Sequence, residues 1–221
     1  MNNAAPELRF YGRRKGRPMN AARQAAFDNL HKYEVTLPNG AFNPAELFSG
    51  KPVHFEIGFG GGEHLIAQAL AHPDTGFIGA EPFINGLSSC AQQIEKNNLT
   101  NVRLWPSDAR LLLDRMEPGS LQMIYLLFND PWPKARHAER RFVSPENLAR
   151  LARVLAPGGG LRIATDDPGL QAWTEEQMAA QKFFAPAPGL YKERPDWPNT
   201  RYEAKAIAAG RRCRYYEWQR Q

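Results

Sequence analysis

The feature that most constrains the fold is a regular alternation of short apolar segments with stretches of helical spacing. The apolar segments are predicted strands, and they cover 53–57, 76–80, 102–105, 121–128 and 161–164. Helices are predicted between them and after the last one, including 84–97 and 168–182. Because parallel strands need a long crossover, usually a helix, the sequence predicts an α/β fold with a doubly wound, mainly parallel sheet.

The helix before the fifth strand has the clearest end signals. Ser144 and Pro145 match an N-cap and the first helical position, and Gly158–Gly160 follow the expected end. Between these signals, Leu148 and Leu151 recur at helical spacing. The segment is therefore predicted to be an amphipathic helix.

The two ends of the chain depart from this alternation. Segments 202–208 and 213–218, joined through Gly210, are predicted to form a C-terminal antiparallel hairpin. Residues 1–23 are rich in Arg, Gly, Pro and Asn, so we expect a mobile basic arm there. Residues 24–221 are predicted to form a single domain, in which 183–199 is a proline-rich connection.

Basic residues gather in three segments of a chain whose formal net charge is +5. Residues 9–23 contain six basic side chains and no acid, and residues 134–141 and 201–220 contain four and six basic side chains. A mildly acidic body with basic patches is typical of a protein that binds a polyanion, although an ordinary solvated surface has the same pattern.

Other sequence features limit the class of protein. The longest apolar run, 121–128, is too short to span a bilayer, and no signal-peptide pattern opens the chain. The two cysteines, Cys90 and Cys213, form no CxxC and no metal-ligand spacing, which suits a reducing compartment. We therefore expect a cytoplasmic protein that has no metal and no membrane attachment.

A glycine-rich turn joins the first strand to the following helix. Gly58, Gly60 and Gly62 let the backbone approach a ligand, and Glu81 and Asp108 end the next two strands. These acids suit ribose hydroxyls and an adenine amino group. The alternative without a ligand is a tight turn followed by ordinary acids at strand ends.

The ligand predicted for this loop is a nucleoside without phosphates. Glu63 stands where the dinucleotide pattern GxGxxG has its last glycine, which argues against a nicotinamide cofactor. S-adenosylmethionine carries a sulfonium and an ammonium group, so acids should line its site. Glu56 is placed to face the ammonium end.

The end of the fourth strand carries the sequence Asn129-Asp-Pro-Trp-Pro-Lys134, at the place where doubly wound folds bind their ligands. Asp130 offers a carboxylate and Trp132 a stacking face, although Trp132 equally suits a cap over the sheet edge. The basic segment 136–141 extends positive charge toward a phosphate backbone. Taken alone, His137 reads as an exposed helix residue.

Seven motifs in the expected order carry a resemblance to a known family. The chain resembles the bacterial tRNA (guanine-N7)-methyltransferases in residues 56–64 (EIGFGGGEH), 79–83 (GAEPF), 107–109 (SDA), 128–134 (FNDPWPK), 136–141 (RHAERR), 164–166 (ATD) and 200–203 (TRYE). The blocks at 128–141 and 200–203 are far more specific than the glycine loop. The resemblance implies a Rossmann-like methyltransferase sheet, S-adenosylmethionine as cofactor, and methylation of the variable-loop guanine of tRNA.

The resemblance also implies a role for each matching residue. Asp130 would be catalytic and would contact the methyl donor together with Glu56, Glu81 and Asp108. The substrate guanosine would be contacted by Lys134, Asp166, Thr200, Arg201, Tyr202 and Glu203. The RNA would be bound by Arg136, His137, Arg140 and Arg141. The partner would be tRNA, and the chain would be a monomer or a homodimer without a metal.

Methyl transfer to guanine N7 makes simple chemical demands on a protein. Guanine N7 has a free lone pair, so attack on a sulfonium methyl needs no deprotonation and the main task is alignment. A fixed carboxylate, Asp130 or Asp166, would stabilise the positive charge that develops on the purine. Three alternatives remain: a methyltransferase of this fold with another acceptor, an oxidoreductase disfavoured by Glu63, and an RNA-binding protein with an inactive nucleotide site.

Overall fold

The computed structural model describes residues 12, 14–187 and 200–221. Its strands are β1 Val53–Ile57, β2 Gly76–Ala80, β3 Val102–Trp105, β4 Leu121–Leu127, β5 Leu155–Thr165, β6 Phe184–Pro186 and β7 Arg214–Arg220. Its α-helices are α1 Ala21–Asp28, α2 Glu63–Ala71, α3 Ile84–Lys96, α4 Ala109–Leu113, α5 Pro145–Val154, α6 Pro168–Ala180 and α7 Arg201–Ala208. Short 3₁₀ helices lie at η1 Leu30–Lys32, η2 Pro44–Phe48 and η3 Ala135–Arg140.

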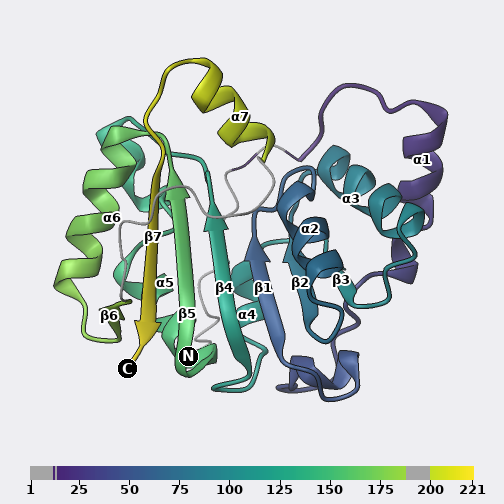
Figure 1. Ribbon diagram of the computed structural model, residues 1–221, viewed down its shortest axis with the longest axis horizontal. Coiled ribbons are helices and arrows are strands. Elements are labelled where there is room, and N and C mark those ends of the chain that lie inside the picture. Colours follow the sequence, from purple (N-terminus) through teal and green to yellow (C-terminus); the bar gives the residue numbers. More distant parts are fainter. Residues whose placement is uncertain (1–11, 13, 188–199) are drawn as a thin grey trace, which may run out of the picture.

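The seven strands form one sheet in the order β3-β2-β1-β4-β5-β7-β6 (Figure 1). The first five strands pair in parallel, as the alternation with helices predicts. The chain order reverses between β1 and β4, which are neighbours although two strands and three α-helices separate them in sequence. Such a switch point is where doubly wound folds bind ligands outside the carboxyl ends of their strands.

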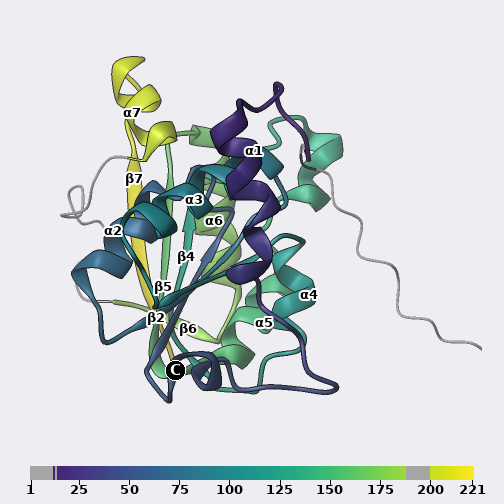
Figure 2. The same ribbon diagram turned by 90° about the vertical axis from the view of Figure 1, so that its right-hand side faces the viewer.

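Helices cover both faces of the sheet. Figure 2 shows α2 and α3 on one side and α4 and α5 on the other. Adjacent residues of β2 illustrate the alternation, because Phe77 packs in the core beside α2 and α3 while Ile78 packs in the core beside α4 and α5. Both side chains are at most 1% exposed, so the central strands have no solvated face.

Most predicted element boundaries agree with the structure. The bounds of β1, β2 and β3 are as predicted, and Ser144 caps α5 by accepting a hydrogen bond from the Asn147 amide. The fifth strand differs because it begins at Leu155 rather than Leu161. Gly158–Gly160 therefore lie inside β5, beside a register shift in its pairing with β4, rather than past the end of the helix.

The predicted C-terminal hairpin is wrong in its first arm, since Tyr202–Ala208 is helical and belongs to α7. Thr200 and Glu203 form a capping box, in which the Glu203 amide donates to Thr200 Oγ1 at 3.1 Å. The antiparallel C-terminal pairing exists, but it joins β7 to β5 and to β6. The T-x-x-E pattern was the available signal for a helix start.

The predicted arm and connection are only partly described. Residues 1–11, 13 and 188–199 lie outside the described residues. The predicted boundary at residue 23 falls within α1. Before that helix, the Arg14 carbonyl accepts from the Ile84 amide at 2.9 Å and the Gly16 amide donates to Asn85 Oδ1 at 2.8 Å. The described part of the arm therefore contacts the start of α3.

Candidate active site at the carboxyl edge of the sheet

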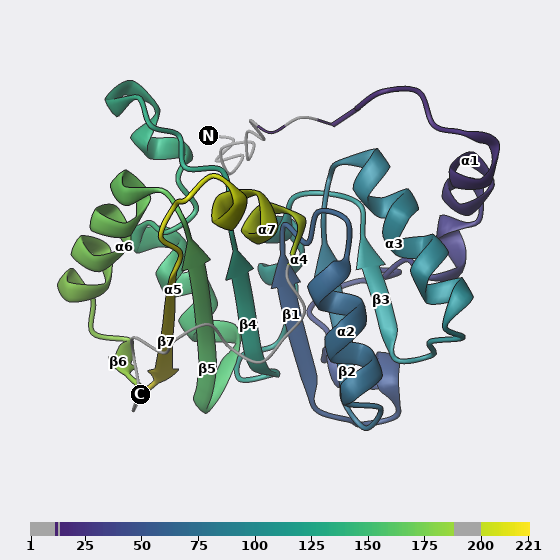
Figure 3. The same ribbon diagram turned by 45° about the horizontal axis from the view of Figure 1, so that its top comes forward.

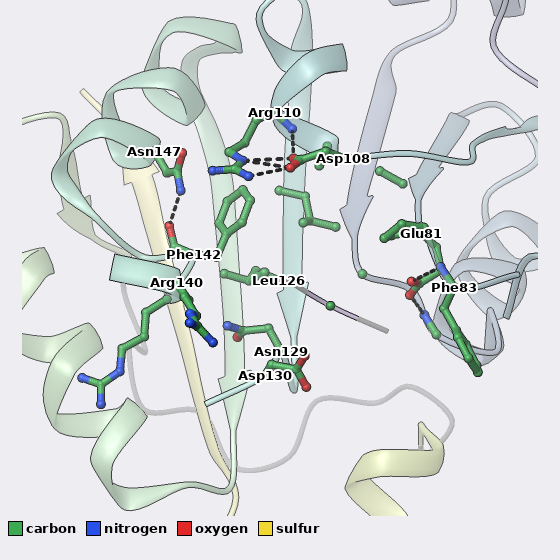
Figure 4. Close-up of a pocket in the computed structure, with 18 of the residues that line it drawn as sticks. Glu81, Phe83, Asp108, Arg110, Leu126, Asn129, Asp130, Arg140, Phe142 and Asn147 are labelled. Carbon is green, nitrogen blue, oxygen red and sulfur yellow. Dashed lines mark hydrogen bonds and ion pairs between the residues drawn. The ribbon is translucent and has the colours of Figure 1, made fainter. Parts of the chain in front are cut away.

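A cavity of about 450 Å³ opens at the carboxyl ends of β1 to β4 (Figure 4). It is lined by the glycine loop, by the residues that follow β2, β3 and β4, and by the end of η3 with the segment after it. Helix α7 lies over the same edge (Figure 3), where Tyr202 contributes to the lining. Three of the four acids predicted to contact the methyl donor, Glu81, Asp108 and Asp130, line this one cavity.

The glycine loop requires glycine for conformation and for space. Gly58, Gly60 and Gly62 have φ values of 71°, 58° and 85°, in the left-handed region. A Cβ on Gly62 would lie 2.7 Å from the sulfur of Cys90, and a Cβ on Gly86 would lie 2.2 Å from the Gly60 carbonyl oxygen. The loop is therefore packed tightly against α3.

Glu81 joins the loop after β2 to the glycine loop. Its Oε2 accepts from the Gly60 amide at 2.8 Å and its Oε1 from the Phe83 amide at 2.9 Å. Burial raises its pKa, the two amide hydrogen bonds oppose this shift, and the charges of Asp130 and Glu56 add to it. Each carboxylate oxygen keeps a further lone pair for a ligand hydroxyl.

Asp108 already has a charged partner. It caps α4 by accepting from the Arg110 amide at 2.9 Å, and the Arg110 guanidinium pairs with the same carboxylate at 2.6 Å (Figure 4). Arg110 itself lines the cavity. Sequence reasoning missed this arginine, since nothing in its spacing separates it from a solvated helix residue.

Asp130 lies in a sharply bent segment at the end of β4. Phe128 and Trp132 have φ values of 52° and 45°, which residues with a Cβ rarely adopt. The Asp130 side chain is exposed beside Asn129, whose buried Oδ1 has no hydrogen-bond partner among the described residues (Figure 4). Asn129 is a cavity residue that sequence reasoning passed over.

The basic segment 134–141 contains residues of two kinds. Lys134 and Arg136 are exposed. The Arg140 guanidinium stands 5.1 Å from the centroid of the Trp132 ring, and His137 packs edge-on to the same ring. Trp132 thus borders the cavity with part of its surface already covered.

Glu56 lies near the cavity but does not line it. It is 3% exposed, and its Oε2 lies 2.7 Å from His64 Nδ1. His64 packs against Tyr125, whose hydroxyl lies 3.3 Å from His54 Nδ1. Burial lowers the pKa of His54 to about 4, with smaller contributions from nearby cationic groups. Sequence reasoning missed this buried network, because spacing gives no signal that β1 and α2 turn Glu56 and His64 toward each other, and Tyr125 comes from the distant β4.

The other predicted substrate residues are only partly brought to the cavity. Tyr202 is 57% exposed and lines it beside Gly60. Glu203 is fully buried and accepts a hydrogen bond from the Tyr215 hydroxyl, in addition to its place in the capping box. Asp166 forms an ion pair with Arg211. These two carboxylates face protein partners instead of the cavity.

The described part of the chain lacks two features. Within it, no cluster of three or more His, Cys, Asp or Glu side chains is placed to hold a metal ion. Its helices include none that is long and apolar enough to cross a membrane.

The chain is similar to known methyltransferases over nearly its whole length. Residues 50–215 match the family model described as "Putative methyltransferase". A "tRNA (guanine-N(7)-)-methyltransferase" of Rhodospirillum rubrum is 46% identical over 97% of this chain and 88% of its own length. A protein of the same name from Granulibacter bethesdensis is also 46% identical, over 96% of this chain and 95% of its own.

Solved structures with low sequence identity share the fold. An antibiotic-related methyltransferase has a TM-score of 0.55 at 20% identity, covering 86% of this chain and 98% of its own. The aminoglycoside resistance methyltransferase NpmB1 has a TM-score of 0.57 at 18% identity, covering 80% and 91%. At this level of identity the likeness supports the fold alone.

Proposed function

The chain belongs to the tRNA (guanine-N(7)-)-methyltransferase family, and we propose that it transfers a methyl group from S-adenosylmethionine to N7 of a guanine in the variable loop of tRNA. The observation that carries this proposal is the meeting of Glu81, Asp108 and Asp130 in one cavity beside the glycine loop. The strand order brings together three acids that lie far apart in the sequence.

The cavity fits a cationic nucleoside better than a phosphorylated one. Its described lining contains no lysine. Three arginines line it, and each has a protein partner: Arg110 pairs with Asp108, Arg140 pairs with Glu139, and the Arg141 guanidinium donates to backbone carbonyls. The carboxylates of Glu81 and Asp130 remain to balance a sulfonium and an ammonium group. The volume of about 450 Å³ lies within the range of small-molecule sites.

Each acid has a proposed task in holding the cofactor. Glu81 would accept from ribose hydroxyls and Asp108 from the adenine amino group, while Gly58, Gly60 and Gly62 let the backbone approach. Glu56, at the end of β1 just before the glycine loop, would attract the ammonium group of the cofactor through its carboxylate. His64 fixes the orientation of the Glu56 carboxylate.

When bound, S-adenosylmethionine would supply an activated methyl group: the lone pair of guanine N7 would form the new bond to the methyl carbon, and the carbon–sulfur bond would break with its electron pair going to sulfur. The protein need not remove a proton. Its task is to align the base and to stabilise the charge that develops on the purine. Asp130 is the favoured group, because its carboxylate is exposed at the cavity whereas Asp166 pairs with Arg211.

The tRNA would be held mainly through phosphates and shape. N7 lies in the deep major groove of an A-form helix, so the target base has to be in a loop or drawn out of its stack. Arg140 lines the cavity, Lys134, Arg136 and His137 precede it on the same basic segment, and Thr200–Glu203 start α7 at the same edge of the sheet. In this proposal the protein is cytoplasmic and acts as a monomer or homodimer.

The test is to incubate the purified protein with methyl-labelled S-adenosylmethionine and unmodified tRNA transcripts, and to digest the RNA to nucleosides. We expect the label in 7-methylguanosine, and none when the variable-loop guanine is replaced. Label in another nucleoside would contradict the acceptor and keep the cofactor. Cofactor binding without any label would contradict tRNA as the substrate.

A further inference from the structure

The segment that carries Asp130 needs external support to keep its shape. Phe128 and Trp132 have left-handed backbone conformations, with φ values of 52° and 45°. Such conformations cost of the order of 1–3 kcal/mol each in residues other than glycine, and they persist only where surrounding contacts impose them. The contacts that hold this segment therefore help to decide where the Asp130 carboxylate lies.

Arg141 supplies contacts of this kind. Its Nε donates to the Pro131 carbonyl at 3.2 Å and its Nη2 donates to the Trp132 carbonyl at 3.2 Å. These carbonyls belong to the two residues on either side of one peptide bond, immediately after Asp130. A guanidinium can donate two bonds side by side from one rigid plane, which a lysine ammonium cannot reproduce.

The guanidinium of Arg141 also contacts an aromatic ring. It stands 4.9 Å from the centroid of the Trp173 ring, on α6. The indole Nε1 of Trp173 donates to the Val143 carbonyl at 2.6 Å, which fixes the ring against the chain just beyond Arg141. Arg141 thus connects the end of β4 to a helix that packs on the core.

We propose that Arg141 is a positioning residue that holds the segment 130–132 so that the Asp130 carboxylate faces the acceptor base, and that it is not an RNA contact. This inference rests on the proposed function. It replaces the role that the resemblance implies for Arg141. Arg136, on the same basic segment, has an exposed side chain and keeps the RNA role.

The decisive experiment compares Arg141→Ala and Arg141→Lys with Arg136→Ala. For each variant we would measure single-turnover methyl transfer at saturating tRNA and cofactor, and tRNA affinity at several salt concentrations. Both Arg141 variants should lose about 100-fold in rate, because a small misplacement of a catalytic group has that effect. Their tRNA affinity and its salt dependence should stay at the wild-type values. Arg136→Ala should weaken tRNA binding and lower the salt slope by about one.

Two outcomes would overturn the proposal. One is a near wild-type rate in Arg141→Lys, since a phosphate contact tolerates lysine. The other is a fall of the salt slope in Arg141→Ala equal to that in Arg136→Ala. If Arg141→Ala does not fold, Arg141→Lys and Trp173→Leu decide, and the second should lose rate without losing tRNA affinity.

A measurement without any substrate separates this inference from the proposed function. In the free protein the Arg141 Nε–H, assigned by its loss in Arg141→Lys, should exchange with solvent more slowly than that of Arg136. Equal exchange would show that the carbonyl contacts are absent and would overturn the positioning role. Failure of the wild-type protein to form 7-methylguanosine would instead count against the proposed function.

Discussion

At the scale of single residues, the acids of the site differ in what already binds them. Glu81 accepts hydrogen bonds from two backbone amides, and Asp108 forms an ion pair with Arg110. Asp130 lines the cavity with an exposed side chain. A carboxylate bound by the protein is held in place, whereas an exposed one can meet a substrate. These partners explain why the three acids have different proposed tasks.

The first prediction concerns Asp130. Asp130→Asn should lower methyl transfer by about 100-fold or more, because the amide cannot balance the charge that develops on the purine. Single-turnover transfer to tRNA measures this effect. Asp74→Asn is the matched control, since the Asp74 side chain is 98% exposed and lies away from the cavity lining. A turnover close to wild type in Asp130→Asn would remove Asp130 from the mechanism.

The second prediction concerns His54, whose pKa is lowered to about 4 by burial. Between about pH 4 and 6.5 the unfolded state binds a proton that the folded state does not, so stability rises with pH across this window. The total change from His54 is of the order of 3 kcal/mol, at 1.36 kcal/mol per pKa unit.

His54→Gln should flatten this part of the stability profile, because glutamine does not titrate and keeps an acceptor for the Tyr125 hydroxyl. Urea unfolding at several pH values between 4 and 7 measures the slope. An unchanged slope in the variant would assign the pH dependence to other groups.

At the scale of elements, α7 shows how one short motif combines a structural and a functional signal. The resemblance predicts that Thr200-Arg-Tyr-Glu203 contacts the substrate, and the same residues start a helix through a capping box. Glu203 also accepts from the Tyr215 hydroxyl, and Tyr215 packs edge-on against Phe128 at the end of β4. The motif therefore joins α7 to the segment that carries Asp130.

The third prediction tests this cap. Thr200→Ala should cost about 1 kcal/mol of stability, because it leaves a helix amide without its acceptor. It should also raise the KM for tRNA, since Tyr202 lines the cavity from the first turn of α7. Thr200→Ser keeps the hydroxyl and should behave as the wild type in thermal unfolding and in tRNA kinetics. Equal losses in both variants would show that the hydroxyl cap is not the cause.

The fold prediction failed at this element for a physical reason. Tyr202–Ala208 and Cys213–Trp218 are short segments on either side of Gly210, and such segments suit a strand or a helix nearly equally by composition. The second became a strand because it pairs with β5 over six residues, from Gly160 to Thr165. The first has no such partner among the described strands and is stabilised by its cap.

At the scale of the whole molecule, basic residues and the cavity share one edge. Segment 134–141 and the start of α7 both lie beyond the carboxyl ends of the strands (Figure 3). The described part of the basic arm contacts α3 at its first turn, next to Phe83 on the cavity wall. A polyanion that enters at this edge would meet positive charge from three parts of the chain.

The fourth prediction follows from this arrangement. Affinity for tRNA should fall at least about tenfold between about 50 and 200 mM salt, because phosphate contacts release counterions. Cofactor affinity should change little over the same range, since Glu81 and Asp108, which are proposed to hold the cofactor, are buried and screened little by salt. Fluorescence titrations at each salt concentration measure both. A flat response for tRNA would show that the basic segments do not contact phosphates.

The sequence by itself determined the features that depend on near neighbours in the chain. Periodicity predicted the first four strands to within one residue, and turn chemistry located the glycine loop, because both depend on residues a few positions apart. The tertiary structure alone decided which side chains meet. It set the partners of Glu56 and Arg141, the meeting of Asp108 with Glu81 and Asp130 in one cavity, and the place of Tyr202. Such contacts depend on how strands and helices pack, and local sequence carries no signal for a partner that folding brings in from elsewhere.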